Sequence, residues 1–222
     1  MMRRAAGACA ALAGLAATAP PAAAHPHMWI DAEAELVFDA AGRLAAVRQT
    51  WRFDEMFSAY GLQGLPRRAD GSYAPDRLQS MADDWMQALG EPESHYFTRV
   101  AQAGRSLPFG PPRAARVVWD KAAERLSLAF ELPLAQPVAL AGKAVQLDVF
   151  DPTYFIAYEF AGQAAVLMTG APQGCSRSYR PPQPMDSRTM QQLAAIPADA
   201  EVPEELFAIT KGLTHRIEVR CP

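Results

Sequence analysis

The sequence lacks the motifs that identify the common classes of enzyme and nucleic-acid-binding protein. It contains no nucleophile elbow, phosphate loop, dinucleotide-binding fingerprint or zinc-protease helix, so we expect that the protein is not an enzyme. Its 222 residues carry a formal net charge of −3 without a basic tract, and we therefore expect no nucleic-acid partner. After residue 24 no apolar run reaches the roughly 20 residues that span a bilayer, so we expect no direct membrane insertion of the mature chain.

Cysteine is also scarce, with three residues in the whole chain. Cys9 lies in the amino-terminal apolar run, and Cys175 and Cys221 lie far downstream. If an amino-terminal signal peptide that contains Cys9 is removed, two cysteines remain in the exported chain. An even number in an oxidising compartment indicates one disulfide, which would connect the end of the chain to the body of the domain. Metal thiolates are the alternative, although neither cysteine lies beside a His or another Cys.

The first 24 residues have the composition of a secretory signal peptide. Arg3 and Arg4 give a basic start, an alanine-rich apolar run follows to about Ala19, and the segment ends in small residues at 22–24. The alternative is an uncleaved membrane anchor, for which the run is short. Cleavage after Ala24 would leave His25 as the first residue of a periplasmic protein, with one domain over residues 25–222.

Alternating apolar and polar residues predict a β-hairpin at the start of this domain. The strands cover 27–38 and 44–53, with Val47, Trp51 and Phe53 on one face of the second strand and polar residues on the other. Asp54 is a candidate amino-terminal cap for a short helix. A second helix is expected over 76–89, so that residues 54–90 form a helical insert.

The remainder is expected to be mainly strands, each bounded by Gly, Pro or Asp. The predicted strands are 96–103, 116–119, 126–132, 144–150, 155–160, 164–168 and 213–219, with short helices at 191–196 and 204–210. This pattern predicts an α+β fold that is mainly antiparallel β and sandwich-like, with the helical insert after the first hairpin.

A candidate metal site lies at His25-Pro26-His27. A free α-amine and the imidazole of His25 could chelate one ion, and His27 points the same way in an extended strand. Imidazole suits Zn, Ni, Co and Cu, so the cofactor we expect is a divalent transition metal. Pro26 has no amide hydrogen, which excludes a square-planar clip that uses deprotonated main-chain amides. Two solvated histidines near a cleavage site are the simpler alternative.

Carboxylates could complete this site. Asp31 and Glu33 continue the same strand face, and Asp151 follows an apolar strand in the turn Asp151-Pro152-Thr153-Tyr154. The predicted metal ligands are therefore His25, His27, Asp31 and Asp151. The alternative for Asp151 is a purely structural role in a turn, which Asp before Pro favours. If the turn is functional, we expect Asp151 and Tyr154 at the mouth of a pocket.

The order of the motifs resembles a known bacterial family. The motifs are His25-Pro26-His27-Met28-Trp29-Ile30-Asp31, Trp51-x-Phe53-Asp54-Glu55, Tyr96-Phe97-Thr98, Pro108-Phe109-Gly110, Asp151-Pro152-Thr153-Tyr154-Phe155, Gly170-Ala171-Pro172 before Cys175, and Cys221-Pro222. The family is catalogued as domain of unknown function 1007 and is labelled an uncharacterised transport-system periplasmic component. The resemblance implies metal handling beside nickel- and cobalt-type membrane transporters.

Three functions remain open at this point. The first is a periplasmic accessory or substrate-binding component of a nickel-, cobalt- or zinc-type transport system, whose partner is a membrane permease. The second is a copper enzyme with an amino-terminal histidine brace, which would need a third nitrogen from His95 or His215. The third is a metal-free interaction module that docks a membrane partner.

Overall fold

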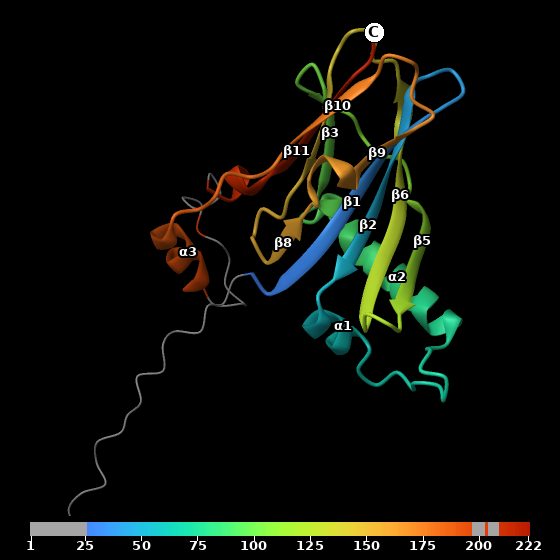
Figure 1. Cartoon of the computed structure of the whole chain (residues 1–222), viewed down its shortest axis with the longest axis vertical. Helices are drawn as coiled ribbons and strands as arrows, with labels where there is room; N and C mark the ends of the chain where they lie inside the picture. Colours follow the sequence, from blue (N-terminus) through green and yellow to red (C-terminus); the bar gives the residue numbers. More distant parts are fainter. Residues whose placement is uncertain (1–25, 197–202, 204–208) are drawn as a thin grey trace, which may run out of the picture.

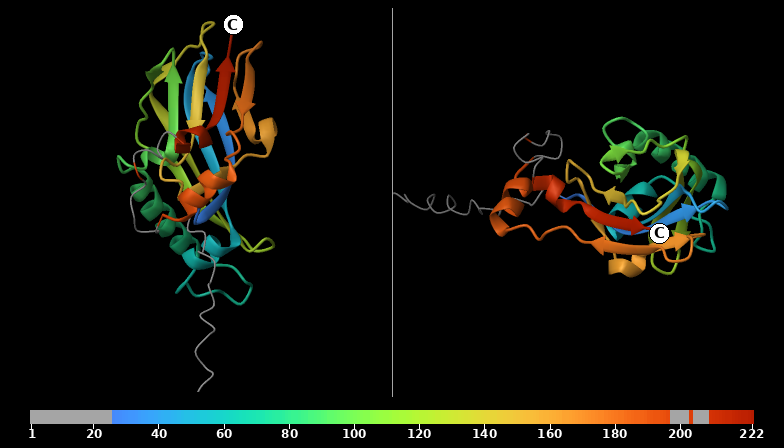
Figure 2. Two further views of the ribbon diagram at one scale, coloured as in Figure 1. Left: turned by 90° about the vertical axis from the view of Figure 1, so that its left-hand side faces the viewer. Right: turned by 90° about the horizontal axis from the view of Figure 1, so that it is seen from above.

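The computed structural model describes residues 26–196, 203 and 209–222 and shows two β-sheets packed face to face (Figure 1). The predicted signal peptide and His25 lie outside these residues. In the left view of Figure 2, the green, yellow, red and orange strands of the second sheet lie in front of the blue strands of the first. The α+β, sandwich-like fold expected from the sequence is confirmed. No described helix is both long and apolar enough to cross a membrane.

The first sheet, sheet A, has the strand order β5-β6-β2-β1-β8, and β9 also pairs with β1. Its strands are β1 (Met28–Phe38), β2 (Leu44–Phe53), β5 (Arg113–Asp120), β6 (Arg125–Val138), β8 (Ile156–Glu159) and β9 (Val166–Thr169). The second sheet, sheet B, has the order β10-β11-β7-β3-β4. Its strands are β3 (Thr98–Gln102), β4 (Arg105–Ser106), β7 (Val145–Val149), β10 (Ser176–Arg180) and β11 (His215–Arg220).

The predicted hairpin forms β1 and β2, which pair antiparallel with Glu33 opposite Thr50. Alternate residues of β1 are buried, from Met28 to Phe38, so one face of the sheet is apolar and the other is polar. Trp51 of β2 lies at the centre of the apolar face, where its ring contacts those of Phe130 and Tyr158. Burial of this face against sheet B is the main stabilising contribution to the fold.

The predicted helical insert forms α1 (Glu55–Gly61) and α2 (Pro75–Leu89). The expected cap is confirmed, because a side-chain oxygen of Asp54 accepts a hydrogen bond from the N–H of Phe57 at 2.8 Å. Helix α2 packs on the apolar face of sheet A beside sheet B, with the Trp85 ring 5.0 Å from the Phe53 ring. Its most buried residues are Ala82 and Met86, so the buried face is displaced to one side of the apolar stripe that the periodicity indicates.

Several elements differ from the sequence-based expectations. Strand β3 starts at Thr98 because the preceding three residues form the 3-10 turn η1 (His95–Phe97) with left-handed backbone angles. Strands β4 and β10 were not expected, and β8 and β9 pair parallel with β1. Helix α3 (Ser187–Ala194) begins earlier than predicted because Asp186 caps it. The 3-10 turns η2 (Gly162–Ala165) and η3 (Lys211–Leu213) complete the elements, and 204–208 of the last predicted helix lie outside the described residues.

The predicted disulfide between Cys175 and Cys221 is present. Ser176 and Arg220, the residues next to the two cysteines, are paired in the β10–β11 ladder, so the bond closes the end of this strand pair. Nearby, Gly170 has φ +68°, and a Cβ at this residue would lie 2.8 Å from the carbonyl oxygen of Phe38. The Gly170-Ala171-Pro172 motif therefore packs at the end of β1, where a larger residue than glycine does not fit.

Candidate functional site at the start of the first strand

Asp54 fixes one side of the start of β1. Its side chain accepts a hydrogen bond from the main-chain N–H of Trp29 at 2.8 Å, and its own N–H donates to the Trp29 carbonyl at 2.9 Å. The other carboxylate oxygen caps α1 through Phe57. One acidic residue therefore connects the first strand, the end of β2 and the first helix.

Asp151 organises the loop on the other side of β1. One carboxylate oxygen accepts from the main-chain N–H of Thr153 at 2.8 Å and from its hydroxyl at 2.7 Å, and the other accepts from the N–H of Ile156 at 2.9 Å. Burial raises the pKa of Asp151, and these hydrogen bonds offset only part of that rise. The carboxylate thus closes a compact turn in which Tyr154 has the left-handed φ of 56°.

His27 lies against this turn. Its main-chain N–H donates to the carbonyl oxygen of Phe155 at 2.9 Å, and the N–H of Met28 donates to the same oxygen at 3.2 Å. The rings of His27 and Phe155 have centroids 4.8 Å apart. The half-buried His27 is therefore held through both its main chain and its ring. Three motifs that are far apart in the sequence meet at the start of one strand.

The structure does not bring the predicted carboxylate Asp31 to His27. The two residues share a strand face but are four positions apart, which is roughly 13 Å along an extended strand. Asp31 instead forms an ion pair with Arg125 at 2.7 Å and a longer one with Arg52 at 3.8 Å. Its charge is compensated by these arginines, so Asp31 is poorly suited to serve as a metal ligand.

Asp151 is close to His27 in the fold, but the connection passes through Phe155. Both of its carboxylate oxygens accept from groups within its own loop, so we assign it a positioning role. Within the described parts of the chain, no three His, Cys, Asp or Glu side chains form a group that could hold a metal ion. His25 lies outside those parts, and its role as a ligand stays a prediction.

His95 and His215, the two candidates for a third nitrogen ligand, differ in their surroundings. His95 is exposed in η1. His215 is buried at the start of β11, with Nδ1 2.9 Å from the hydroxyl of Tyr179 and its ring hydrogen-bonded to the main chain of Tyr158. Burial lowers the pKa of His215 to about 4, so this ring is neutral at physiological pH. Because its ring is buried and Nδ1 lies within hydrogen-bond distance of Tyr179, His215 is poorly placed to serve in a histidine brace.

Asp151 and Tyr154 line a small pocket, which the sequence suggested as the functional alternative for this turn. The pocket has a volume of about 120 Å³ and also contacts Tyr158 and His215. Burial, followed by the charge of Asp151, raises the pKa of Tyr158 well above its ordinary value. Leu193 packs against Tyr154, so α3 covers the loop.

The role of Phe155 could not be predicted from the sequence, although this residue belongs to one of the quoted motifs. Its carbonyl and its ring are the groups that hold His27. The available signal was its position as the first residue of the predicted strand 155–160. The parallel pairing of that strand with β1, which starts with Met28 opposite Ile156, could not be inferred from periodicity.

A comparison with known families matches residues 10–221 to the family described as Protein of unknown function (DUF1007). The chain belongs to this family. The family predicted from the motifs is therefore confirmed over nearly the whole sequence. A relative from Haemophilus influenzae, described as an uncharacterized protein, is 26% identical over 155 residues, which cover 68% of this chain and 70% of the relative.

Proposed function

We propose that this DUF1007 protein is an exported accessory component of a transition-metal transport system and binds one divalent ion at its amino-terminal histidines. The observation that supports the proposal is the way in which the Asp151–Phe155 turn holds His27. A histidine with a fixed main chain and ring loses less conformational freedom on binding an ion than a histidine in a mobile chain end.

The donors in this proposal are nitrogen atoms. The α-amine and imidazole of His25, after cleavage, would bind together with the imidazole of His27. Neutral imidazole suits zinc, nickel, cobalt and copper. Since Asp31 is paired with arginines and Asp151 is occupied by its own loop, the chain end would supply three donors. The remaining coordination position would be open to water or to a donor from the receiving protein.

An open coordination position suits a protein that passes an ion to a partner, and the partner we propose is a membrane permease. Export to the periplasm is consistent with the disulfide between Cys175 and Cys221, because such bonds persist mainly in oxidising compartments. The amino-terminal segment, with its signal-peptide composition, supports the same compartment. This proposal assigns the protein a binding role and no catalytic step.

Calorimetry on the processed protein tests the proposal. Zinc, nickel, cobalt and copper are titrated into the wild-type chain and into variants His25→Ala, His27→Ala and the double variant. We expect one ion per chain and a loss of affinity of at least about tenfold for each substitution, since even changes to the neighbours of ligands have effects of this size. His95→Ala, which removes an exposed histidine, is the matched control and should bind as the wild type does.

Equal uptake of all four metals by the wild type and the double variant would contradict the proposal. Redox turnover after copper loading would contradict it in a different way, because a histidine-brace enzyme would then explain the histidines better. The processed protein must also be sequenced from its amino terminus, so that a chain starting away from His25 is recognised.

A further inference from the structure

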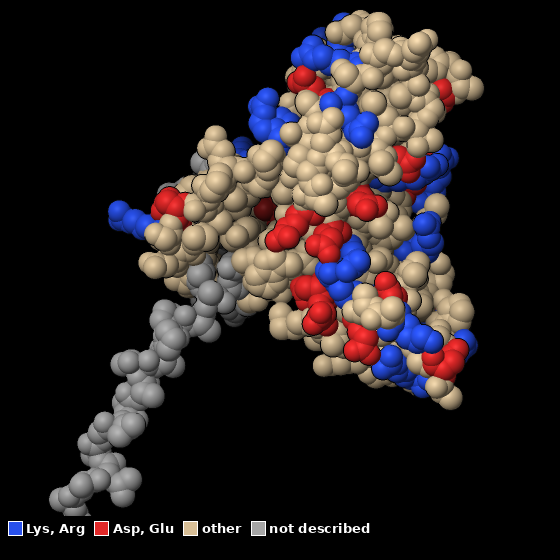
Figure 3. Space-filling model, viewed as in Figure 1, with Lys and Arg blue, Asp and Glu red and all other residues tan. Residues whose placement is uncertain are grey.

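The polar face of sheet A is not covered by any of the described elements. In Figure 1 the strands β1, β2, β6 and β5 lie in front of α2, and Figure 3 shows acidic and basic side chains next to one another over these strands. The residues on this face form rows that run across the strands. Their arrangement differs from row to row, and the difference indicates what the face binds.

One row is a complete chain of ion pairs, which we call the closed row. Its members are Glu35 of β1, Arg48 of β2, Glu131 of β6 and Arg113 of β5, which lie opposite one another in the strand register. Arg48 contacts Glu131 at 2.6 Å and Glu35 at 3.3 Å, and Arg113 Nε contacts the other oxygen of Glu131 at 2.6 Å. The charges alternate along the row, and each has at least one partner.

The adjacent row begins and ends with the same charges but has none in the middle, and we call it the open row. Its members are Glu33 of β1, Thr50 of β2, Ala129 of β6 and Arg116 of β5. Neither Glu33 nor Arg116 forms an ion pair with another residue in the described part of the chain. The small side chains of Thr50 and Ala129 lie in the floor of a hollow of about 390 Å³. Glu33 and Arg116 line this hollow from the open row, and Glu35, Arg48 and Glu131 line it from the closed row.

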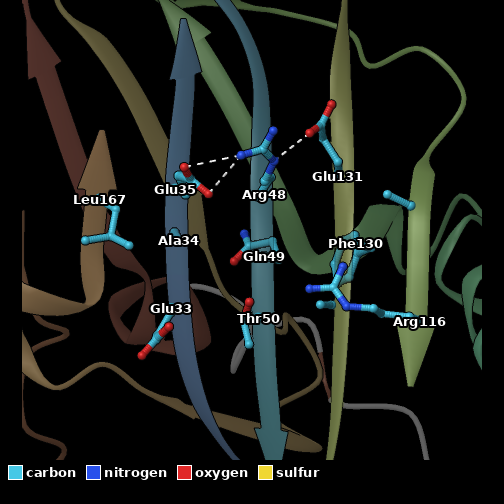
Figure 4. A pocket seen from close by; sticks show the side chains of 12 residues that line it. Glu33, Ala34, Glu35, Arg48, Gln49, Thr50, Arg116, Phe130, Glu131 and Leu167 are labelled. Carbon is cyan, nitrogen blue, oxygen red and sulfur yellow. Dashed lines mark hydrogen bonds and ion pairs between the residues drawn. The ribbon is translucent and has the colours of Figure 1, made fainter. Parts of the chain in front are cut away.

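Figure 4 shows Glu35, Arg48 and Glu131 of the closed row beside Glu33, Thr50 and Arg116 of the open row. Dashed lines connect Arg48 to Glu35 and Glu131, whereas Glu33 and Arg116 have none. Relative to the closed row, the open row lacks a cation next to Glu33 and an anion next to Arg116. The missing cation would lie over Thr50 on β2 and the missing anion over Ala129 on β6. Neighbouring strands are about 4.8 Å apart, so a ligand would have to present these two charges from side chains with Cβ atoms about 5 Å apart.

We propose that this face docks a segment of a partner protein that places one basic and one acidic side chain over Thr50 and Ala129. Side chains four residues apart on a helix have Cβ atoms about 5–6 Å apart, so one helix face presents the required pair. The basic group would pair with Glu33 and the acidic group with Arg116, which completes the open row. Complementary charges of this kind specify the partner and its register.

Apolar side chains near the hollow favour a polypeptide over a free ion or a small zwitterion. Leu167 lines the hollow and is 46% exposed, and Val118 on β5 is 47% exposed. Protein interfaces combine such apolar contacts with polar pairs, whereas an ion would use only the charges. This inference goes beyond the proposed function and does not depend on a bound metal.

The test uses defined peptides and the processed protein in metal-free buffer of low ionic strength. The probe is a capped, alanine-based helical peptide with Lys and Glu four residues apart, and its control has the same composition with Lys and Glu on opposite faces. Nuclear magnetic resonance follows the main-chain N–H groups of Thr50 and Ala129. We expect saturable shifts with the probe peptide and weaker, non-saturating ones with the control.

Two variants test whether the open row is responsible. Glu33→Gln with Arg116→Gln should weaken probe binding about tenfold, since two exposed ion pairs are lost. Thr50→Arg with Ala129→Glu supplies the missing charges from the chain itself and should abolish binding. Glu91→Gln with Arg77→Gln removes exposed charges from another region and should leave binding unchanged. Circular dichroism confirms that each variant is folded.

Three results would overturn the proposal. The first is an equal response to the probe and control peptides, or no saturable response to either. The second is the same shifts from a mixture of free lysine and glutamate at the same concentrations, which would indicate a small-molecule site. The third is a concentration-dependent shift without peptide, which would indicate that a second copy of the chain occupies the face. Metal titrations are unaffected by any of these outcomes, so the two proposals fail independently.

Discussion

Different interactions stabilise the two ends of the sandwich. We call the end at which β1 finishes the finishing end, and the end at which β1 starts the beginning end. At the finishing end a disulfide joins Cys175 to Cys221. The turn between β1 and β2 also packs closely there, because a Cβ at Gly42 would lie 2.8 Å from Pro172 Cγ. This end is stabilised by a covalent bond and by steric fit.

At the beginning end, carboxylates bind the main chain. Asp54 accepts from the N–H of Trp29, and Asp151 closes the turn that holds His27 through Phe155. Five of the quoted motif segments divide in the same way, three at the beginning end and two at the finishing end. The comparison indicates that the finishing end stabilises the domain, while the beginning end presents the histidine that we propose as a metal ligand.

The largest expected effect is at the finishing end. Replacing both Cys175 and Cys221 with Ser should lower the free energy of unfolding by roughly 4 kcal/mol, because the bond closes a 46-residue separation and constrains the unfolded chain. Urea denaturation measures the change. Zinc affinity should stay at the wild-type value, since the disulfide lies at the far end of β1. A loss of zinc affinity, or unchanged stability, would remove the distinction between the two ends.

The second effect is at the beginning end. Asp151→Ala leaves the N–H groups of Thr153 and Ile156 without their acceptor, and we expect a loss of roughly 3 kcal/mol in stability. Zinc affinity should fall as well, because the turn that holds His27 is loosened. Urea denaturation and calorimetry provide the two readouts.

Asp186→Ala is the matched control for Asp151. Asp186 also accepts from the N–H and hydroxyl of a threonine, Thr189, but it is exposed on α3. We expect a much smaller loss of stability and wild-type zinc affinity. If the two alanine variants behaved alike, burial of the Asp151 turn would not be the reason for its effect.

The smallest of the three effects depends on pH. The pKa of His215 is about 4 in the folded protein and 6.5 in its ordinary state, so the unfolded chain binds a proton more readily. His215 therefore contributes stability above pH 6.5 that is lost as the pH falls toward 4. Between pH 8 and pH 5 the loss should be roughly 2 kcal/mol. The raised pKa of Asp151 has the opposite sign, since protonation of that carboxyl favours the folded state.

Thermal denaturation at several pH values checks this prediction, with His215→Gln as the variant. The free energy of unfolding of the variant should change less between pH 8 and pH 5 than that of the wild type. His95→Gln, at an exposed position, should retain the wild-type dependence. An identical pH dependence in His215→Gln would show that the buried ring is not the group responsible.

Local features of the fold could be predicted from the sequence because their causes are local. Alternation in 27–38 and 44–53 gave the first hairpin within one residue, and Asp54 was recognised as a helix cap. Strand β10 was missed because its sequence, Ser176–Arg180, contains a single apolar side chain, Tyr179. The parallel pairing of β8 with β1 joins distant segments, and periodicity contains no information on such pairing.

The candidate site could be predicted only in part for the same reason. The alternation of side chains along β1 correctly predicted that Asp31 lies on the same strand face as His27. It contains no information on Arg125 and Arg52, which form ion pairs with this carboxylate. Asp151 was proposed as a ligand from its place after an apolar strand. Its carboxylate instead accepts hydrogen bonds within the turn whose Phe155 carbonyl accepts from the N–H of His27, and periodicity contains no information on these contacts.

Native mass spectrometry of the exported protein, purified without chelators, tests the central claim most directly. The claim is that a processed amino end, held by the Asp151–Phe155 turn, binds a transition metal. We predict a chain that starts at His25, contains one disulfide and carries a single divalent ion, which is lost in His27→Ala. A chain that starts at another residue and takes up no ion after exposure to zinc, nickel, cobalt and copper would contradict this account.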